Sequence, residues 1–168
     1  MKLVSEGDAS PEGTVSGLAK GTYYIKLSNG SSKIYSIGYK FYSIADKSGS
    51  TKAKAGTLKI GKASEGLLLT TDKSSKVDWY KLKTTKKKAT TITLFGEVTG
   101  GVTLEFIDSK GDSFGKLYIS AYTTEDSGSP YVSSYYDTEG KLPKGTYYVK
   151  VTKDDKDVSG YYTIMVSQ

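Results

Sequence analysis

Residues 56–63 read GTLKIGKA and have the glycine and lysine spacing of a phosphate-binding loop. In such loops a serine or threonine follows the lysine and coordinates Mg²⁺, and the N-terminus of the next helix holds the phosphate. Here Ala63 stands where that hydroxyl is needed, and the residues after it, SEGLLL, do not begin a helix. We therefore reject nucleotide binding by this stretch.

The composition leaves few residue types for catalysis. The 168 residues include no cysteine and no histidine. This removes thiolate nucleophiles, disulfides, Cys/His zinc sites and the commonest general base. Only Ser/Lys or carboxylate pairs remain for an enzyme, and no motif organises them. We therefore predict that the chain is not an enzyme.

The charge of the chain comes from lysine alone. All 24 basic residues are lysines, and the formal net charge is +6. A lysine ammonium lacks the planar fork with which arginine grips phosphates and bases, so nucleic-acid binding gains little support. No apolar run approaches the ~20 residues that a membrane helix needs. We expect a solvated surface, with no nucleic acid and no membrane insertion.

Surface aromatic residues give the stronger functional signal. Alternation along residues 117–122 points Tyr118 and Tyr122 outward, and the same reasoning places Trp79 and Tyr148 away from the core. Tyrosine and tryptophan combine rigid contact area with a polar tip and often anchor protein or glycan ligands. We predict that these four residues contact a ligand. The alternative is that they pack against lysines and merely cover a sheet.

The elements that carry these residues are predicted to be strands. The sequence holds 15 tyrosines and 19 glycines but only 3 prolines, a composition that favours strands joined by tight turns. No window longer than a turn or two shows the 3.6-residue period of a helix. We therefore predict an all-β fold.

One strand pattern occurs twice. Residues 18–27 read LAKGTYYIKL, and residues 142–151 read LPKGTYYVKV. Each copy continues through a polar turn, 29–30 in the first copy and 153–157 in the second, into a return strand. Alternation assigns one side of each first strand to a core; these residues are Tyr23, Ile25 and Leu27 in the first copy and Tyr147, Val149 and Val151 in the second.

This repeat predicts the domain organisation. Residues 1–45 correspond to the C-terminal part of one module, and residues 46–168 to a complete second copy. The polar, lysine-rich stretch 45–55 suits the boundary between them. The partial copy lacks partner strands for its apolar side. We expect residues 1–44 to pack against the complete module, to share strands with another molecule, or to belong to a longer array.

Four stretches of the complete copy carry a family resemblance. They are GTLKIGKASEGLLL, VDWYKL, VTLEFIDSKG, and LPKGTYYVKV followed by SGYYTIMV. In this order and spacing they resemble the bacterial pre-peptidase C-terminal domains, relatives of the collagen-binding domains of clostridial collagenases. The resemblance covers about residues 46–168. It implies an antiparallel, jelly-roll-like β-sandwich that is a non-catalytic part of a secreted bacterial protein.

The resemblance also implies a calcium site. Several members of that family bind calcium through acidic residues, and the matching positions here are Asp46, Asp72 and Asp78. Calcium takes six to eight oxygen ligands. The segment before the module offers only Asp46 among three lysines, so the site is eroded. The alternative is that Asp72 and Asp78 bond backbone amides at turns. We expect no cofactor, with calcium as the alternative.

These observations predict a non-catalytic binding module of a larger secreted or cell-surface bacterial protein. Its ligand is an extracellular protein or glycan held on an aromatic β-face, and its other partners are neighbouring domains. The alternative is a structural spacer repeat with no ligand. Residues 1–10 lack the pattern of a signal peptide, so the secretion signal is expected upstream of the sequence.

Overall fold

The computed structural model describes residues 15–28, 34, 36–122, 131–138 and 140–168. These residues form a short 3-10 helix and nine strands, in the order η1 (Lys52–Lys54), β1 (Gly56–Leu58), β2 (Ala63–Leu68), β3 (Val77–Thr84), β4 (Thr91–Val98), β5 (Val102–Asp108), β6 (Ser113–Ile119), β7 (Tyr131–Asp137), β8 (Gly145–Lys153) and β9 (Gly160–Ser167). The all-β prediction is confirmed. No helix in this described part is long and apolar enough to cross a membrane.

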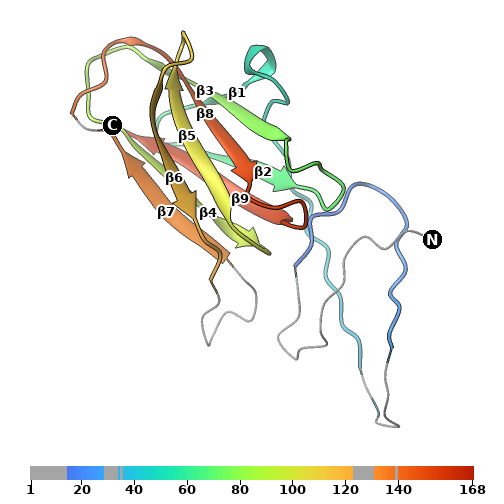
Figure 1. Ribbon diagram of the computed structural model, residues 1–168. Helices are drawn as coiled ribbons and strands as arrows, with labels where there is room; N and C mark the ends of the chain where they lie inside the picture. The colour runs from blue at the N-terminus through green and yellow to red at the C-terminus, as the bar shows by residue number, and fades with distance from the viewer. Residues whose placement is uncertain (1–14, 29–33, 35, 123–130, 139) are drawn as a thin grey trace.

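The strands form two sheets that face each other as a sandwich (Figure 1). Sheet A has the order β1-β3-β8-β5-β6, and sheet B has the order β2-β9-β4-β7. The pairing is antiparallel except between β1 and β3, which are parallel. Except for the β5–β6 hairpin of sheet A, strands consecutive in the chain, such as β8 and β9, lie in opposite sheets. This crossing between sheets is typical of jelly-roll sandwiches and confirms the predicted architecture.

Alternation along the last two long strands fills the space between the sheets. The buried positions are Tyr147, Val149 and Val151 of β8 and Tyr162, Ile164 and Val166 of β9. Tyr147 also donates a hydrogen bond of 3.0 Å from its hydroxyl to the carbonyl of Pro143, four residues earlier. The predicted core side of the second copy is therefore confirmed.

The lysine-rich stretch at residues 45–55 lies against the edge of the sandwich. The backbone N–H of Gly49 donates to the carbonyl of Trp79 at 2.9 Å, and the N–H of Trp79 donates back at 2.8 Å. The N–H of Lys47 donates to the carbonyl of Glu65 on β2 at 2.9 Å. The stretch therefore spans the edges of both sheets, and it fixes the backbone at Trp79.

The described residues between 15 and 44 form no strand, which differs from the predicted hairpin. Ile25 is 66% exposed and Leu27 is 43% exposed, so the prediction that they are buried was wrong. The reason is that no sheet formed by the described residues covers their side of the chain. The predicted turn at residues 29–30 lies outside the described residues. Figure 1 shows this part of the chain extending away from the sandwich.

Residues 18–23 nevertheless keep the local geometry of the second copy. The hydroxyl of Tyr23 donates to the carbonyl of Ala19 at 2.6 Å, as Tyr147 does to Pro143. Gly21 lies beside the Tyr23 ring, and Gly145 lies beside the Tyr147 ring. One backbone hydrogen bond connects this part to the sandwich: the N–H of Thr70 donates to the carbonyl of Gly17 at 2.9 Å. The same local tyrosine contact is thus present in both copies, although only the second copy forms a strand there.

Candidate functional site

The outer side of sheet A carries alternating aromatic and lysine side chains. Trp79 and Lys81 of β3 lie opposite Lys150 and Tyr148 of β8, respectively. Lys150 in turn lies opposite Glu105 of β5. Because neighbouring residues of a strand point to opposite sides, all five share the side of sheet A that faces away from sheet B. We call the surface formed by Trp79, Lys81, Glu105, Tyr148 and Lys150 the outer face.

Trp79 and Tyr148 form an aromatic pair on this outer face. Their ring centroids are 6.4 Å apart, and the planes meet at 80°, an edge-to-face arrangement. The ammonium of Lys150 lies 5.6 Å from the centroid of the Trp79 ring, and that of Lys52 lies 4.8 Å from the centroid of Tyr148. Both rings are half-buried. The pair is therefore a fixed platform bordered by positive charge.

Glu105 places one negative charge among these lysines. Its carboxylate accepts a hydrogen bond of 2.5 Å from Lys150 and lies 3.8 Å from the ammonium of Lys116. Burial alone would raise the pKa of Glu105, but the hydrogen bond and charge of Lys150 outweigh it and hold that pKa below its ordinary value. The carboxylate is therefore ionised at neutral pH and fixes the position of Lys150.

The other two predicted aromatics lie apart from this pair. Tyr118 of β6 is 72% exposed and lies opposite Thr103 of β5. It shares the outer side of sheet A with Trp79 but is three strands away, roughly 14 Å at the usual strand spacing. Tyr122 is 44% exposed and lies beyond the end of β6. The structure thus brings together Trp79 and Tyr148, and it leaves Tyr118 and Tyr122 toward the far edge.

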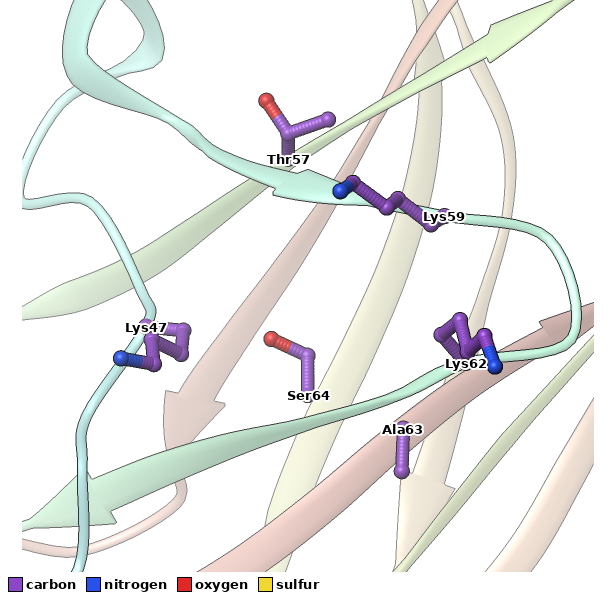
Figure 2. A pocket seen from close by; sticks show the side chains of 6 residues that line it. All are labelled: Lys47, Thr57, Lys59, Lys62, Ala63 and Ser64. Atoms are coloured by element: carbon purple, nitrogen blue, oxygen red, sulfur yellow. The ribbon is translucent and has the colours of Figure 1, made fainter.

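A basic pocket lies between the edge strands β1 and β2 (Figure 2). It has a volume of about 340 Å³ and is lined by Lys47, Thr57, Lys59, Lys62, Ala63 and Ser64. Four of these belong to the phosphate-loop-like stretch 56–63, which here runs from strand to strand with no helix. Figure 2 shows the ammonium groups of Lys47 and Lys62 pointing to opposite sides. The pocket is positively charged, but its cations do not converge on one point.

The structure brings two of the three predicted calcium ligands together. The ammonium of Lys76 lies between them, 2.9 Å from Oδ2 of Asp72 and 3.5 Å from Oδ1 of Asp78. Asp72 also accepts a hydrogen bond of 2.9 Å from the backbone N–H of Leu69. Asp46 is exposed, and its carboxylate accepts from the N–H of Ser48 at 2.9 Å.

Asp78 is the buried member of this group. Its side chain is 1% exposed, and its Oδ2 accepts a hydrogen bond of 2.9 Å from the hydroxyl of Tyr162. Burial raises the pKa of Asp78 above its ordinary value, although the charge of Lys76 and the hydrogen bond from Tyr162 partly offset it. Burial would lower the pKa of Lys76, but its contacts with Asp72 and Asp78 outweigh this and raise it.

These residues do not fit a bound calcium ion. An ammonium already lies where an ion would have to touch both carboxylates. Within the described ranges, no three Asp, Glu, His or Cys side chains gather in a way that could hold a metal. The sequence reasoning missed Lys76, although its place four residues after Asp72 and two before Asp78 was a usable signal.

Comparison with known proteins gives similarity in structure only. No family model and no curated protein matches the sequence. Among solved structures, the pre-peptidase C-terminal domain of a collagenase from Bacillus anthracis has a TM-score of 0.46 and 17% identity, over 66% of this chain and 92% of that one. The resemblance found in the sequence is to the same kind of domain.

Carbohydrate-binding modules are also among the similar structures. A CBM35 module in complex with a glucuronic acid containing disaccharide has a TM-score of 0.44 and 12% identity, over 76% of this chain and 86% of that one. A carbohydrate-binding module from Cellvibrio mixtus lichenase 5A, in complex with cellotriose, has a TM-score of 0.35 and 14% identity, over 66% and 89%. These matches to a pre-peptidase C-terminal domain and to carbohydrate-binding modules are similarities of fold alone.

Proposed function

We propose that this chain is a non-catalytic binding module of a larger secreted or cell-surface bacterial protein, and that it holds an extracellular protein or glycan on the outer face of sheet A. The observation that carries the proposal is the edge-to-face pair of Trp79 and Tyr148, with lysine ammonium groups beside both rings. Aromatic rings and flanking polar groups are common anchors of such ligands.

The shape of the outer face favours an extended ligand. The face is the side of a five-stranded sheet, and its aromatic pair lies across the adjacent strands β3 and β8. An extended polymer can lie across such a surface and contact both rings at once. Tyr118 and Tyr122, toward the β6 edge, would contact a longer ligand. Glu105 supports the arrangement because it holds Lys150 beside Trp79.

The surroundings of the carboxylates support a non-catalytic function. Asp72 and Asp78 lie on either side of one ammonium, and Asp78 is buried. A general acid or base must reach substrate within hydrogen-bond distance, directly or through one water. Asp78 cannot do so while its side chain is 1% exposed.

The test is binding of the whole chain to arrays of glycans and matrix proteins. For any ligand found, Trp79→Ala and Tyr148→Ala should each weaken binding by roughly tenfold or more, as expected for aromatic anchors. Tyr135→Ala is the matched control, since Tyr135 is 63% exposed but belongs to β7 of sheet B. Equal losses in all three variants would exclude the outer face as the binding surface.

The second candidate is a structural spacer, and the repeated tyrosine geometry favours it. Tyr23 and Tyr147 make the same hydrogen bond four residues back, as expected if residues 1–45 are the last part of a module like residues 46–168. Partners would then be neighbouring domains, or a second molecule that shares strands with residues 1–44. Absence of any ligand on the arrays, with unchanged behaviour of the Trp79→Ala variant, would favour this candidate.

A further inference from the structure

Oxygen atoms of the loop between β2 and β3, together with those of Asp78 at the start of β3, contact two lysine ammonium groups. Lys76 contacts the carboxylates of Asp72 and Asp78 at 2.9 and 3.5 Å. From the end of β8, Lys153 donates to the backbone carbonyl of Leu69 at 3.1 Å and to that of Asp72 at 2.9 Å. Lys153 is only 4% exposed. Carboxylate and carbonyl oxygens together are the ligand types that hard cations take from proteins.

One oxygen of this group has no hydrogen-bond partner. Oδ1 of Asp78 is buried and makes no hydrogen bond of ordinary geometry with the described residues, although the side chain of Ser48 lies close enough to help lower the pKa of Asp78. Tyr162 already occupies the other oxygen of this carboxylate. The nearest described positive charge is the ammonium of Lys76 at 3.5 Å, beyond an ordinary hydrogen bond. A buried carboxylate oxygen without a donor is costly unless a cation lies close to it.

We propose that the carboxylates of Asp72 and Asp78 form a cation site whose resident cation is the ammonium of Lys76. The ammonium contacts one oxygen of each carboxylate, as a bound ion would, and it is covalently part of the chain. A divalent cation cannot enter while the ammonium is present, because both would occupy the space between the same two oxygens. This inference is independent of the proposed ligand on the outer face.

The proposal predicts that a divalent cation can replace the lysine once the ammonium and its side-chain volume are removed. In Lys76→Ala, the oxygens of Asp72 and the free Oδ1 of Asp78 are left with room for an ion and its waters. In Lys76→Met, the ammonium is lost but the side chain still fills most of the space. The two variants therefore separate loss of charge from opening of the site.

The experiment measures the Tm of the whole chain with EDTA and with millimolar calcium. Wild type should show no calcium-dependent shift. Lys76→Ala and Lys76→Met should both have a lowered Tm in EDTA, and calcium should raise the Tm of Lys76→Ala only, since a ligand that binds the native state stabilises it. Lys73→Ala is the control, because Lys73 is exposed on the same loop. It should behave like wild type.

Three results would overturn the proposal. A calcium-dependent shift in wild type would show that the site is open despite the lysine. An unchanged Tm in Lys76→Ala would show that the ammonium does not hold the carboxylates. A lowered Tm in Lys76→Ala without recovery in calcium would make Lys76 an ordinary ion-pair partner. Lys76→Ala combined with Asp72→Asn should abolish the recovery if the ion binds between these carboxylates.

Discussion

The hydroxyl groups of Tyr80 and Tyr162 lie 3.0 Å apart in the interior of the sandwich, and they join its two sheets by a hydrogen bond. Tyr80 belongs to β3 of sheet A, and Tyr162 belongs to β9 of sheet B. Their rings meet edge to face, with centroids 6.3 Å apart. Tyr162 also donates to Asp78, so Tyr80 donates to Tyr162 at 3.0 Å when that carboxylate is ionised. The other acceptor near the Tyr80 hydroxyl, the carbonyl of Glu65, is farther away at 3.4 Å. The two sheets therefore share a polar link that ends on a buried carboxylate.

Removing the hydroxyl of Tyr162 should destabilise the fold more than removing that of Tyr80. Tyr162→Phe leaves Asp78 buried without its donor, and we expect a loss of about 2 kcal/mol in the free energy of unfolding, as for hydrogen bonds to charged groups. Tyr80→Phe removes a bond between neutral groups and should cost about 1 kcal/mol. Urea unfolding of both variants measures the difference. Equal losses would contradict the assignment of Tyr162 as the donor to Asp78.

Gly66 of β2 is required because the ring of Tyr162 lies over it. The two residues are paired across the strands, and a Cβ at Gly66 would lie 2.2 Å from a ring carbon of Tyr162. Gly66→Ala should therefore displace the ring and lower stability by about 1–3 kcal/mol, as overpacking does. Gly38→Ala is the control, since a Cβ there meets no atom within 4 Å. Thermal unfolding of the two variants is the measurement, and a Gly66→Ala variant as stable as the control would be inconsistent with this packing.

The buried phenols of Tyr80 and Tyr162 should not ionise while the chain is folded. Burial raises the pKa of both above the ordinary value for tyrosine. Their stabilising contribution is complete below the unfolded-state pKa, about 10, and is lost as the pH rises through the folded-state pKa. An ultraviolet titration of phenolate should show two tyrosines that ionise only together with loss of structure. Tyr80→Phe and Tyr162→Phe should each remove one of these two tyrosines from the titration. Reversible ionisation of all tyrosines in the folded state would contradict the prediction.

The stabilising contribution of Glu105 to the fold should be lost in acid. Its pKa is lowered in the folded state, so its contribution is present above the unfolded-state pKa and is lost as the pH falls through the folded-state pKa. We expect Glu105→Gln to be less stable than wild type near neutral pH by about 0.5–1 kcal/mol, the usual size for a partly exposed pair. The difference should shrink in acid. Urea unfolding across this pH range tests it, and a difference that does not change with pH would exclude the charge of Glu105 as its cause.

Much of the sandwich could be predicted from side-chain alternation. The rule separated Tyr147 from Tyr148 correctly, because a lysine two residues after Tyr148 marked the solvent side. It did not predict that Trp79 and Tyr148 are half-buried. Lysine side chains from β8 and from η1 lie beside the rings, and alternation carries no information on such contacts.

The same rule was wrong for residues that no sheet of the described part of the chain covers. Ile25 and Leu27 have the pattern of a core strand, but a pattern buries a side chain only if another element covers it. The acidic site was implied by the family resemblance, which pointed to Asp72 and Asp78 but not to the ammonium between them. The length and direction of the Lys76 side chain decide that contact, and both depend on the folded loop.

The three lysines of the basic pocket also affect whether two molecules can associate through the edges of their sheets. Strands β1 and β2 are edge strands of their sheets, and such edges are templates on which a second molecule can add a strand and begin to aggregate. Lys47, Lys59 and Lys62 are exposed there, and none of them forms an ion pair within the described residues. Pairing two such edges would crowd like charges together. This side of the sandwich is thereby protected against edge-to-edge association.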